Sequence, residues 1–299
     1  MVFRFIEAEK ANHAVSTMCR VLEVSRSGYY AWSSRPPSER AVANLALVGD
    51  IRRVHAESDG TYGSRRVHAQ LRREGHEVNL KRVERLMRVE RIQGAYVPPK
   101  RRRGGGDGVL GVDGVRAWPD LVKRDFQPAG PNELWCSDLK QIPTGEGVLH
   151  LASVLDCFSR RIVGWAMGPT ADAPLVAQAL RMAVSQRRPG EGIVLHSDRG
   201  CQYTAVTFGS ACRAHGVTQS NSGKGSPHDN AAKESFFASL EKERLRRRTY
   251  ATHEQARSSV FQYIEEFYNR RRLHSTLGYR SPEEVENEHH RALSIITAA

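Results

Sequence analysis

Three acidic residues stand where an α/β fold could bring their carboxylates together. Asp138 lies inside an apolar stretch that predicts a strand over residues 134–142, and Asp198 directly follows a second predicted strand over residues 193–197. Glu234 falls in the first turns of a predicted helix that follows a glycine-rich loop. Open α/β sheets build their sites at the carboxyl ends of strands. We therefore expect the three carboxylates to converge on one rim of a sheet.

Carboxylates in such a cluster suit a hard divalent cation. Mg²⁺ takes oxygen ligands and binds substrate phosphates, and Mn²⁺ can substitute for it. Two ions about 4 Å apart can activate an attacking oxygen and stabilise the leaving oxygen of a phosphodiester. In that arrangement Asp138 would bridge the two ions, and Asp198 and Glu234 would each complete the ligands of one ion. The residue types therefore predict metal-dependent phosphodiester chemistry without a serine, cysteine or histidine nucleophile.

Four short segments surround these acids. They are WCSD at 135–138, LDCFSR at 155–160, HSDRGCQY at 196–203 and DNAAKESFF at 229–237. Between Asp198 and Glu234 lie 35 residues. The segments and this spacing resemble the integrase-core transposases of bacterial insertion sequences. The resemblance implies a catalytic core with Asp138, Asp198 and Glu234 as its acidic triad.

Further segments extend the resemblance over nearly the whole chain. YNRRRLHSTLGY at 268–279 resembles the family's C-terminal motif, and VSRSGYY at 24–30 and GTYGSRR at 60–66 resemble its N-terminal part. More narrowly, the chain resembles the downstream-frame protein of a two-frame insertion sequence. The resemblance implies a homo-oligomer on DNA, a dimer or larger, and an upstream-frame helix-turn-helix protein as fusion or partner. That partner carries a leucine zipper, which this sequence lacks.

The predicted activity is cleavage and strand transfer of DNA at the ends of an insertion sequence. A nuclease of the same fold is the nearest enzymatic alternative, but it would not need a basic helical N-terminus. A non-catalytic DNA-binding regulator, derived from a transposase or inhibiting one, is the alternative from another class. That alternative predicts the loss of at least one acid, and all three are present.

The charge distribution favours a polyanionic partner. The net charge is +12, and residues 1–124 carry 24 basic against 14 acidic side chains, while the remainder carries 21 against 19. A basic first third joined to a nearly neutral remainder predicts a DNA-binding module attached to a catalytic one. The candidate DNA contacts are Arg82, Arg85, Arg101, Arg102, Arg103, Lys224, Asn230, Lys233, Arg272 and His274. Arg272 and His274 have an alternative interpretation, in which they pack the tail on the core.

Hydrophobic periodicity predicts an α/β protein with four regions. Residues 1–97 form an all-α DNA-binding region, with a helix-turn-helix outline near residues 14–32, and residues 98–124 form a basic flexible linker. Residues 125–250 follow the order of three strands, helix, strand, helix, strand and helix, which is typical of a ribonuclease-H-like, mixed five-stranded sheet with helices. Residues 251–299 form a helical tail, irregular around Pro282.

Several single residues carry two interpretations. Asp156 could be a fourth metal ligand, but we favour a turn residue that pairs with Arg160 or Arg161. Gln202 and Tyr203 could line the cleft or pack beneath it. The five cysteines are never spaced as CxxC, so we expect them to be reduced and mostly buried rather than zinc ligands.

The sequence contains no membrane signal. No apolar run approaches the ~18 residues of a membrane span, and charged residues occupy the N-terminus where a signal peptide would need an apolar stretch. We therefore expect a cytoplasmic bacterial protein that associates with the nucleoid.

Overall fold

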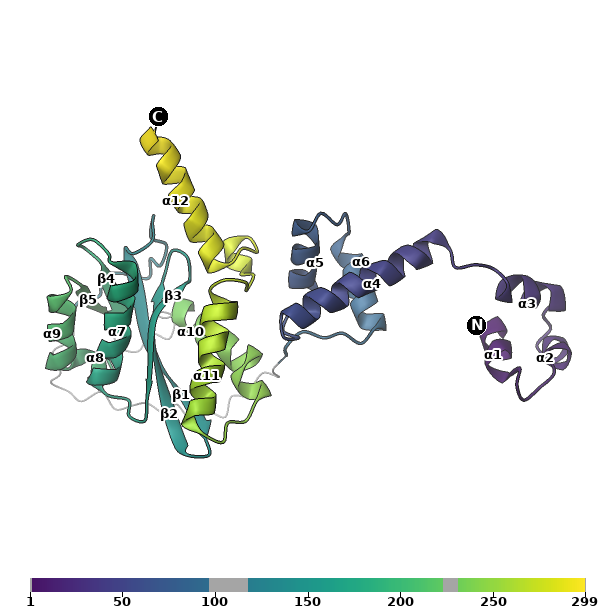
Figure 1. The fold of residues 1–299 in the computed structure, drawn as a ribbon, viewed down its shortest axis with the longest axis horizontal. Coiled ribbons are helices and arrows are strands. Elements are labelled where there is room, and N and C mark those ends of the chain that lie inside the picture. Colours follow the sequence, from purple (N-terminus) through teal and green to yellow (C-terminus); the bar gives the residue numbers. More distant parts are fainter. Residues whose placement is uncertain (1, 97–117, 223–230, 299) are drawn as a thin grey trace.

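The structure is a computed structural model that describes residues 2–96, 118–222 and 231–298; for residues 231–234 and 297–298 it describes the backbone alone. Two helical units precede a five-stranded sheet with helices on both faces, and a helical tail completes the chain (Figure 1). Within the described residues, no helix is long and apolar enough to cross a membrane.

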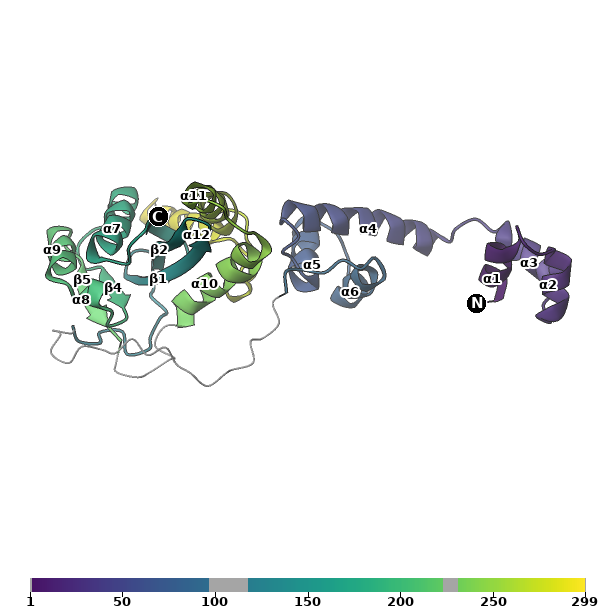
Figure 2. The ribbon, with the colours of Figure 1, turned by 90° about the horizontal axis from the view of Figure 1, so that it is seen from below.

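The first helical unit consists of α1 (Val2–Glu9), α2 (Val15–Val21) and α3 (Arg26–Ser33). The Oγ atom of Ser25 accepts a hydrogen bond of 2.8 Å from the Gly28 N–H and so caps α3. Ile6, Met18, Cys19 and Tyr29 form a small core of their own. The predicted helix-turn-helix outline is thus present in α2 and α3. Figures 1 and 2 both show this unit beyond the N-terminal end of α4, away from the sheet.

The second helical unit consists of α4 (Glu39–Glu57), α5 (Ser64–Arg73) and α6 (Leu80–Val89). In each helix the buried residues recur at helical spacing, as Leu47, Ile51 and Val54 do in α4. The side chain of Asn79 accepts a hydrogen bond of 2.8 Å from the Arg82 N–H at the start of α6. Helices α5 and α6 therefore form a second helix-turn-helix outline, in addition to that of α2 and α3.

The sheet has the strand order β3-β2-β1-β4-β5. Its strands are β1 (Leu134–Thr144), β2 (Gly147–Asp156), β3 (Ile162–Gly168), β4 (Val194–Ser197) and β5 (Thr218–Asn221). The first three form an antiparallel meander, whereas β4 pairs with β1 and β5 pairs with β4 in parallel. The expected order of a ribonuclease-H-like core is confirmed, and β1 and β4 lie within two residues of their predicted bounds.

Helices cover both faces of the sheet. On one face lie α7 (Ala173–Arg187), the short α8 (Cys201–Thr204) and α9 (Val206–Ala214); on the other lie α10 (Ala231–Glu243) and α11 (His253–Phe261) (Figure 2). Alternation along β1 serves both layers, because Trp135 packs under α7 while Leu134 and Cys136 pack on the opposite side.

The tail is more helical than the sequence suggested. After α11 a π-helical turn covers Gln262–Tyr268 and a 3₁₀ turn covers Ser275–Leu277. Pro282 begins α12 (Pro282–Ala298), which projects from the body in Figure 1. Proline is tolerated in the first turn of a helix, so the predicted irregular stretch ends at this residue instead of continuing around it.

Candidate active site

Strands β1 and β4 place the two aspartates side by side. The parallel register pairs Cys136 with His196, and two more residues along each strand lead to Asp138 and Asp198. Neighbouring strands lie about 4.8 Å apart. The Leu139 N–H donates to Oδ1 of Asp138 (2.8 Å), and the Gly200 N–H donates to Oδ1 of Asp198 (2.9 Å). Asp138 is half-buried and Asp198 is exposed, so the pair opens toward solvent at the rim of the sheet.

Tyr203 lies under both aspartates. Its hydroxyl is 3.1 Å from Oγ of Ser137, and its side chain is 1% exposed. Burial raises the pKa of Tyr203 well above its ordinary value, and the charges of Asp138 and Asp198 raise it further. The hydroxyl of Tyr203 is thus buried beside Ser137, the residue that precedes Asp138 on β1. Of the two interpretations offered for Tyr203, packing beneath the site describes its position.

Asn221 holds the end of β4, and sequence reasoning missed it. Its Nδ2 donates to Oγ of Ser197 (3.0 Å) and to the backbone carbonyl of Asp198 (2.9 Å). Asn221 is fully buried at the end of β5. A polar residue ending a short buried strand was the available signal, but its partner could not be known before β4 and β5 were paired.

Helix α10 carries Glu234 in its first turn and packs against β1 through Phe236, Phe237 and Leu240. Nζ of Lys140 on β1 pairs with Glu241 at 3.0 Å and ties the last turn of the helix to that strand. The side chain of Glu234 is outside the described part of the chain. Among the side chains described, no group of three or more His, Cys, Asp or Glu could hold a metal ion. The third carboxylate therefore stays a prediction.

The candidate DNA contacts differ in how exposed their side chains are. Lys81, Arg85 and Arg88 are exposed and recur along one face of α6, whereas Arg82 is half-buried and donates from Nε to the side-chain oxygen of Asn44 (3.0 Å). Outside the described residues or side chains lie Arg101, Arg102, Arg103, Lys224, Asn230 and Lys233.

Arg272 and His274 require a correction. Each is 5% exposed, and Arg272 makes two hydrogen bonds of 2.7 Å with the carboxylate of Glu243. Side chains buried in this way do not reach a DNA backbone. Both residues instead pack the tail on the core, which is the alternative interpretation. Arg272 is buried because it pairs with Glu243, an acid that is distant in the sequence.

Asp156 is a structural acid. It is fully buried, and its Oδ1 accepts hydrogen bonds from the Phe158 and Ser159 N–H groups at 3.0 and 3.3 Å, which confirms the turn interpretation. Asp156 pairs with Arg160 and Arg161 through backbone hydrogen bonds of 2.8 and 2.9 Å, and the ion pairs of the described residues do not join its carboxylate to either arginine. The cation nearest to Asp156 is Arg187, at 3.9 Å.

Arg161 is paired elsewhere, because Glu286 on α12 competes for it at 3.0 Å. Glu286 also binds Arg187, at 2.8 Å. The buried cluster of Asp156, Arg187 and Glu286 thus attaches α12 to the core.

Comparison with known proteins agrees with this arrangement. A family described as Integrase core domain matches residues 128–227, a second family of that description matches residues 215–282, and an HTH-like domain family matches residues 43–103. Transposase InsF for insertion sequence IS3A from Escherichia coli (strain K12) is 35% identical over 294 residues, covering 96% of this chain and 99% of that protein. The chain belongs to the IS3 family of transposases.

Other similar proteins include the insertion element IS600 uncharacterized 31 kDa protein of Shigella sonnei, which is 37% identical over 91% of this chain and 98% of its own length. The catalytic core domain of BIV integrase covers 55% of this chain and 99% of that chain with 20% identity and a TM-score of 0.41. The HTLV-2 integrase catalytic core domain in complex with magnesium covers 54% and 99%, with 14% identity and a TM-score of 0.40.

Family membership settles the predicted activity class. The protein is a DDE-type transposase with an integrase catalytic core, and it acts in DNA transposition. The HTH-like match lies on α4–α6, whereas the sequence analysis placed the helix-turn-helix outline on α2 and α3. The transposase therefore has two such outlines in its N-terminal region, and the second is the one that the family match supports.

The described cysteines are free, as expected for reduced side chains. Cys19, Cys136, Cys157 and Cys212 are buried, and Cys201 alone among the five is exposed. The Sγ atoms of Cys136 and Cys157 approach to 3.1 Å in the layer between the sheet and α10.

Proposed function

We propose that Asp138, Asp198 and Glu234 bind two Mg²⁺ ions and that the transposase uses them to cleave and join DNA strands at the ends of its insertion sequence. The observation that carries the proposal is the register of β1 and β4, which continues into Asp138 and Asp198 above a single buried tyrosine. Two carboxylates held this close repel each other, and a divalent cation between them offsets the repulsion.

The donor set fits magnesium. Asp138 and Asp198 offer carboxylate oxygens at an open rim, where phosphate and water could supply the remaining oxygen ligands of a magnesium ion. When bound, the two ions would lower the pKa of an attacking water or 3′-hydroxyl and stabilise the leaving oxygen. Asp138 lies centrally and would bridge the ions, while Asp198 and Glu234 would each hold one.

The surrounding residues orient the acids and move no proton in this scheme. Backbone N–H groups fix Oδ1 of Asp138 and of Asp198. Because its pKa is raised well above 10, Tyr203 stays protonated beneath the site. Asn221 holds the backbone of Asp198. The two aspartates are thereby held in place before metal and DNA arrive, which is how preorganised sites lower reaction barriers.

DNA binding by the helical N-terminal region is the second part of the proposal. The exposed cations on α6 and the surplus of basic residues before residue 124 support it. We further propose a homo-oligomer on DNA, a dimer or larger, with the upstream-frame helix-turn-helix protein as fusion or partner, acting in the bacterial cytoplasm at the nucleoid. The likeness to downstream-frame transposases over almost the whole chain supports these partners.

The experiment that tests the proposed metal site incubates the protein, alone and fused to its upstream-frame partner, with a labelled element end. We expect cleavage in Mg²⁺ or Mn²⁺, binding without cleavage in Ca²⁺ and no cleavage in excess EDTA. Equal cleavage in excess EDTA would contradict the proposal.

A further inference from the structure

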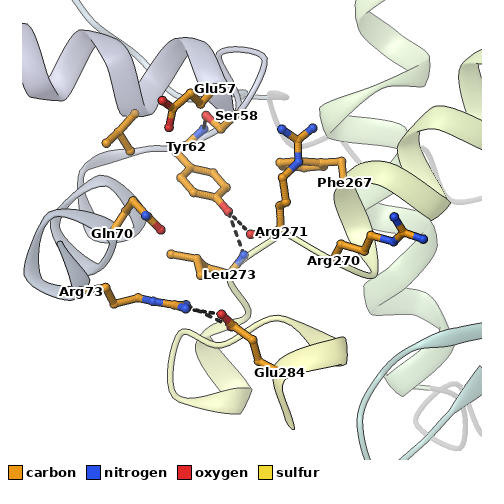
Figure 3. A pocket seen from close by; sticks show the side chains of 11 residues that line it. Glu57, Ser58, Tyr62, Gln70, Arg73, Phe267, Arg270, Arg271, Leu273 and Glu284 are labelled. Atoms are coloured by element: carbon orange, nitrogen blue, oxygen red, sulfur yellow. Dashed lines mark hydrogen bonds and ion pairs between the residues drawn. The ribbon is translucent and has the colours of Figure 1, made fainter. Parts of the chain in front are cut away.

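Two segments that the proposed chemistry does not use meet between the second helical unit and the tail. They are the GTYGSRR segment at 60–66 and the segment at 268–279. The Tyr62 hydroxyl donates to the carbonyl of Arg271 (3.0 Å) and accepts from the Leu273 N–H (2.8 Å), as Figure 3 shows. Nε of Arg66 donates to the Leu273 carbonyl at 2.8 Å. We call this contact the joint.

Peripheral ion pairs surround the joint. Arg73 of α5 binds Glu284 of α12, and the carboxylate of Asp59 lies 3.4 Å from Arg248, which follows α10 (Figure 3 shows the first pair). Exposed pairs of this kind contribute little free energy each. The orientation of the second helical unit is therefore determined mainly by the buried groups at the centre of the joint.

Glu243 lies at that centre. It is 3% exposed and accepts 2.7 Å hydrogen bonds from Nε and Nη2 of Arg272 and a 2.8 Å hydrogen bond from the Tyr263 hydroxyl. Nη1 of Arg66 lies 3.7 Å from the same carboxylate. The helical unit and the tail thus share one buried anion.

The charges in the joint are mutually dependent. Burial alone would raise the pKa of Glu243, but Arg272 and Arg66 hold it below its ordinary value. Burial and the neighbouring arginines, Arg272 first, lower the pKa of His274 to about 2, so this imidazole is neutral. A buried ion pair is a poor source of stability compared with apolar packing, and its best-supported use is to fix a unique geometry. The joint therefore sets an orientation.

Glu243 is the last residue of α10, and Glu234 lies in the first turn of the same helix. Glu243 follows Glu234 by nine positions of helix, or about 13 Å along the axis. A helix of this length moves as one body, so a change at its C-terminal end is transmitted to its N-terminal end. The joint therefore holds the opposite end of the helix that carries the predicted third metal ligand.

We propose that Glu243 is a positioning residue that couples docking of the α4–α6 unit to the placement of Glu234. Docking brings Arg66 to Glu243 and fixes the C-terminal end of α10; undocking leaves Arg272 as its remaining buried cation and loosens the helix. This coupling rests on the proposed role of Glu234 in metal binding. Metal binding would then depend on whether the α4–α6 unit is docked.

The test uses the full-length chain and changes Arg66, which lies 150 residues or more away from α10 in the sequence and leaves the Glu243–Arg272 pair intact. Arg66→Ala is compared with Arg53→Ala, an arginine of the same unit whose partners Glu57 and Glu74 lie within that unit. Arg66→Lys, which keeps the positive charge toward Glu243, serves as the conservative variant. Amide hydrogen exchange over residues 231–243 is measured without DNA or metal, and the Mg²⁺ midpoint for cleavage is measured separately.

The expected result for Arg66→Ala is faster exchange across α10 and a Mg²⁺ midpoint raised about tenfold, in the range typical of coupling between sites. Arg66→Lys should recover part of both effects, and Arg53→Ala should change neither. Unchanged exchange in α10, or an unchanged midpoint, in Arg66→Ala overturns the coupling. Equal changes in Arg53→Ala also overturn it, because they would report general loosening.

Failure of the coupling can be told apart from failure of the proposed metal site. If Glu234→Gln is inactive while exchange in α10 ignores Arg66, the site stands and the coupling is wrong. If Glu234→Gln cleaves like the parent, the assignment of the third ligand is wrong, and the coupling to metal falls with it, whatever the exchange shows.

Discussion

The rim of the sheet and the joint at the end of α10 place their carboxylates in opposite environments. Asp138 and Asp198 lie next to each other at an open edge, and backbone amides fix one oxygen of each. Glu243 is buried, with two arginines and a tyrosine around it. Two neighbouring carboxylates at a surface repel each other and are stabilised by a bound cation. The buried carboxylate of Glu243 is already neutralised by arginines of the protein. The first arrangement suits a changing ligand and the second a fixed geometry.

The largest expected effect comes from the rim. Asp138→Asn or Asp198→Asn should lower the rate of DNA cleavage by more than about a thousandfold, because each removes a proposed metal ligand that would help to place the attacking and leaving oxygens. Melting temperature and DNA affinity should stay close to the parent values. Strand-cleavage assays on a labelled element end, with circular dichroism and binding titrations alongside, check the prediction.

Glu234→Gln belongs to the same prediction, and its matched control is Glu254→Gln, an exposed glutamate in the first turn of α11. Glutamine and glutamate have similar helix propensity, so α10 should survive the change. Parent-like cleavage by both variants would place the metal site elsewhere.

The second-largest expected effect is a loss of stability at the joint. Glu243→Ala should lower the free energy of unfolding by about 3–5 kcal/mol, because it leaves Arg272 buried without its carboxylate. Glu241→Ala, two residues earlier on α10 and 28% exposed, should cost less than about 1 kcal/mol. Urea denaturation of the two variants makes the measurement. Similar losses for both would contradict the contrast between rim and joint.

The joint also predicts a pH dependence. The pKa of His274 is lowered to about 2 in the folded protein, while an unfolded histidine titrates near 6.5. Stability from this group is therefore complete above pH 6.5 and falls as the pH drops below it, because the unfolded chain alone takes up the proton.

Between pH 6.5 and 5 this difference amounts to about 1–2 kcal/mol. His274→Gln should show a flatter stability profile over that interval. His290→Gln, at an exposed position of α12, should keep the slope of the parent protein. Parallel profiles for the parent and His274→Gln would refute the assignment.

The smallest expected effect lies on α6. Arg85→Ala should reduce the slope of log affinity against log salt by about 0.9 if the side chain neutralises one phosphate. Arg213→Ala, an exposed arginine on α9, should leave the slope unchanged. Fluorescence anisotropy over a salt series distinguishes the two. A slope that ignores Arg85 but responds to Arg213 would move the DNA-binding surface from the helical units to the core.

Local patterns predicted the strands and helices of the core well, because alternation and helical spacing are written in neighbouring residues. The partners of Asp156 and Arg272 could not be found in this way. Asp156 has two arginines nearby in sequence, yet Arg187 is its nearest cation because Glu286 engages Arg161. Arg272 sits in a run of arginines that resembles a solvated surface, and its burial depends on Glu243, 29 residues earlier.

The predicted irregular stretch around Pro282 was wrong for a related reason. Pro282 is compatible both with an irregular segment and with the first turn of a helix, and the buried contact of Glu286 with Arg187 stabilises the second. The acidic triad, by contrast, is predicted from segments and spacing that resemble those of a family, and it stays a prediction. The structure adds the register of β1 and β4, decides between the two interpretations of Tyr203, and adds Asn221, which no local pattern identified.

The topology of the sheet also bears on when the enzyme becomes complete during synthesis. The meander β1–β3 pairs neighbouring segments, but Asp198 meets Asp138 only after 60 further residues have been made and β4 has docked in parallel. The hydrogen bond from Tyr62 to Arg271 spans 209 residues. Long-range pairings of this kind form slowly and late, and domains fold from the N-terminus as the ribosome releases them. A chain that stops just before residue 271 therefore contains both aspartates and α10 but lacks the joint that connects the second helical unit to the tail.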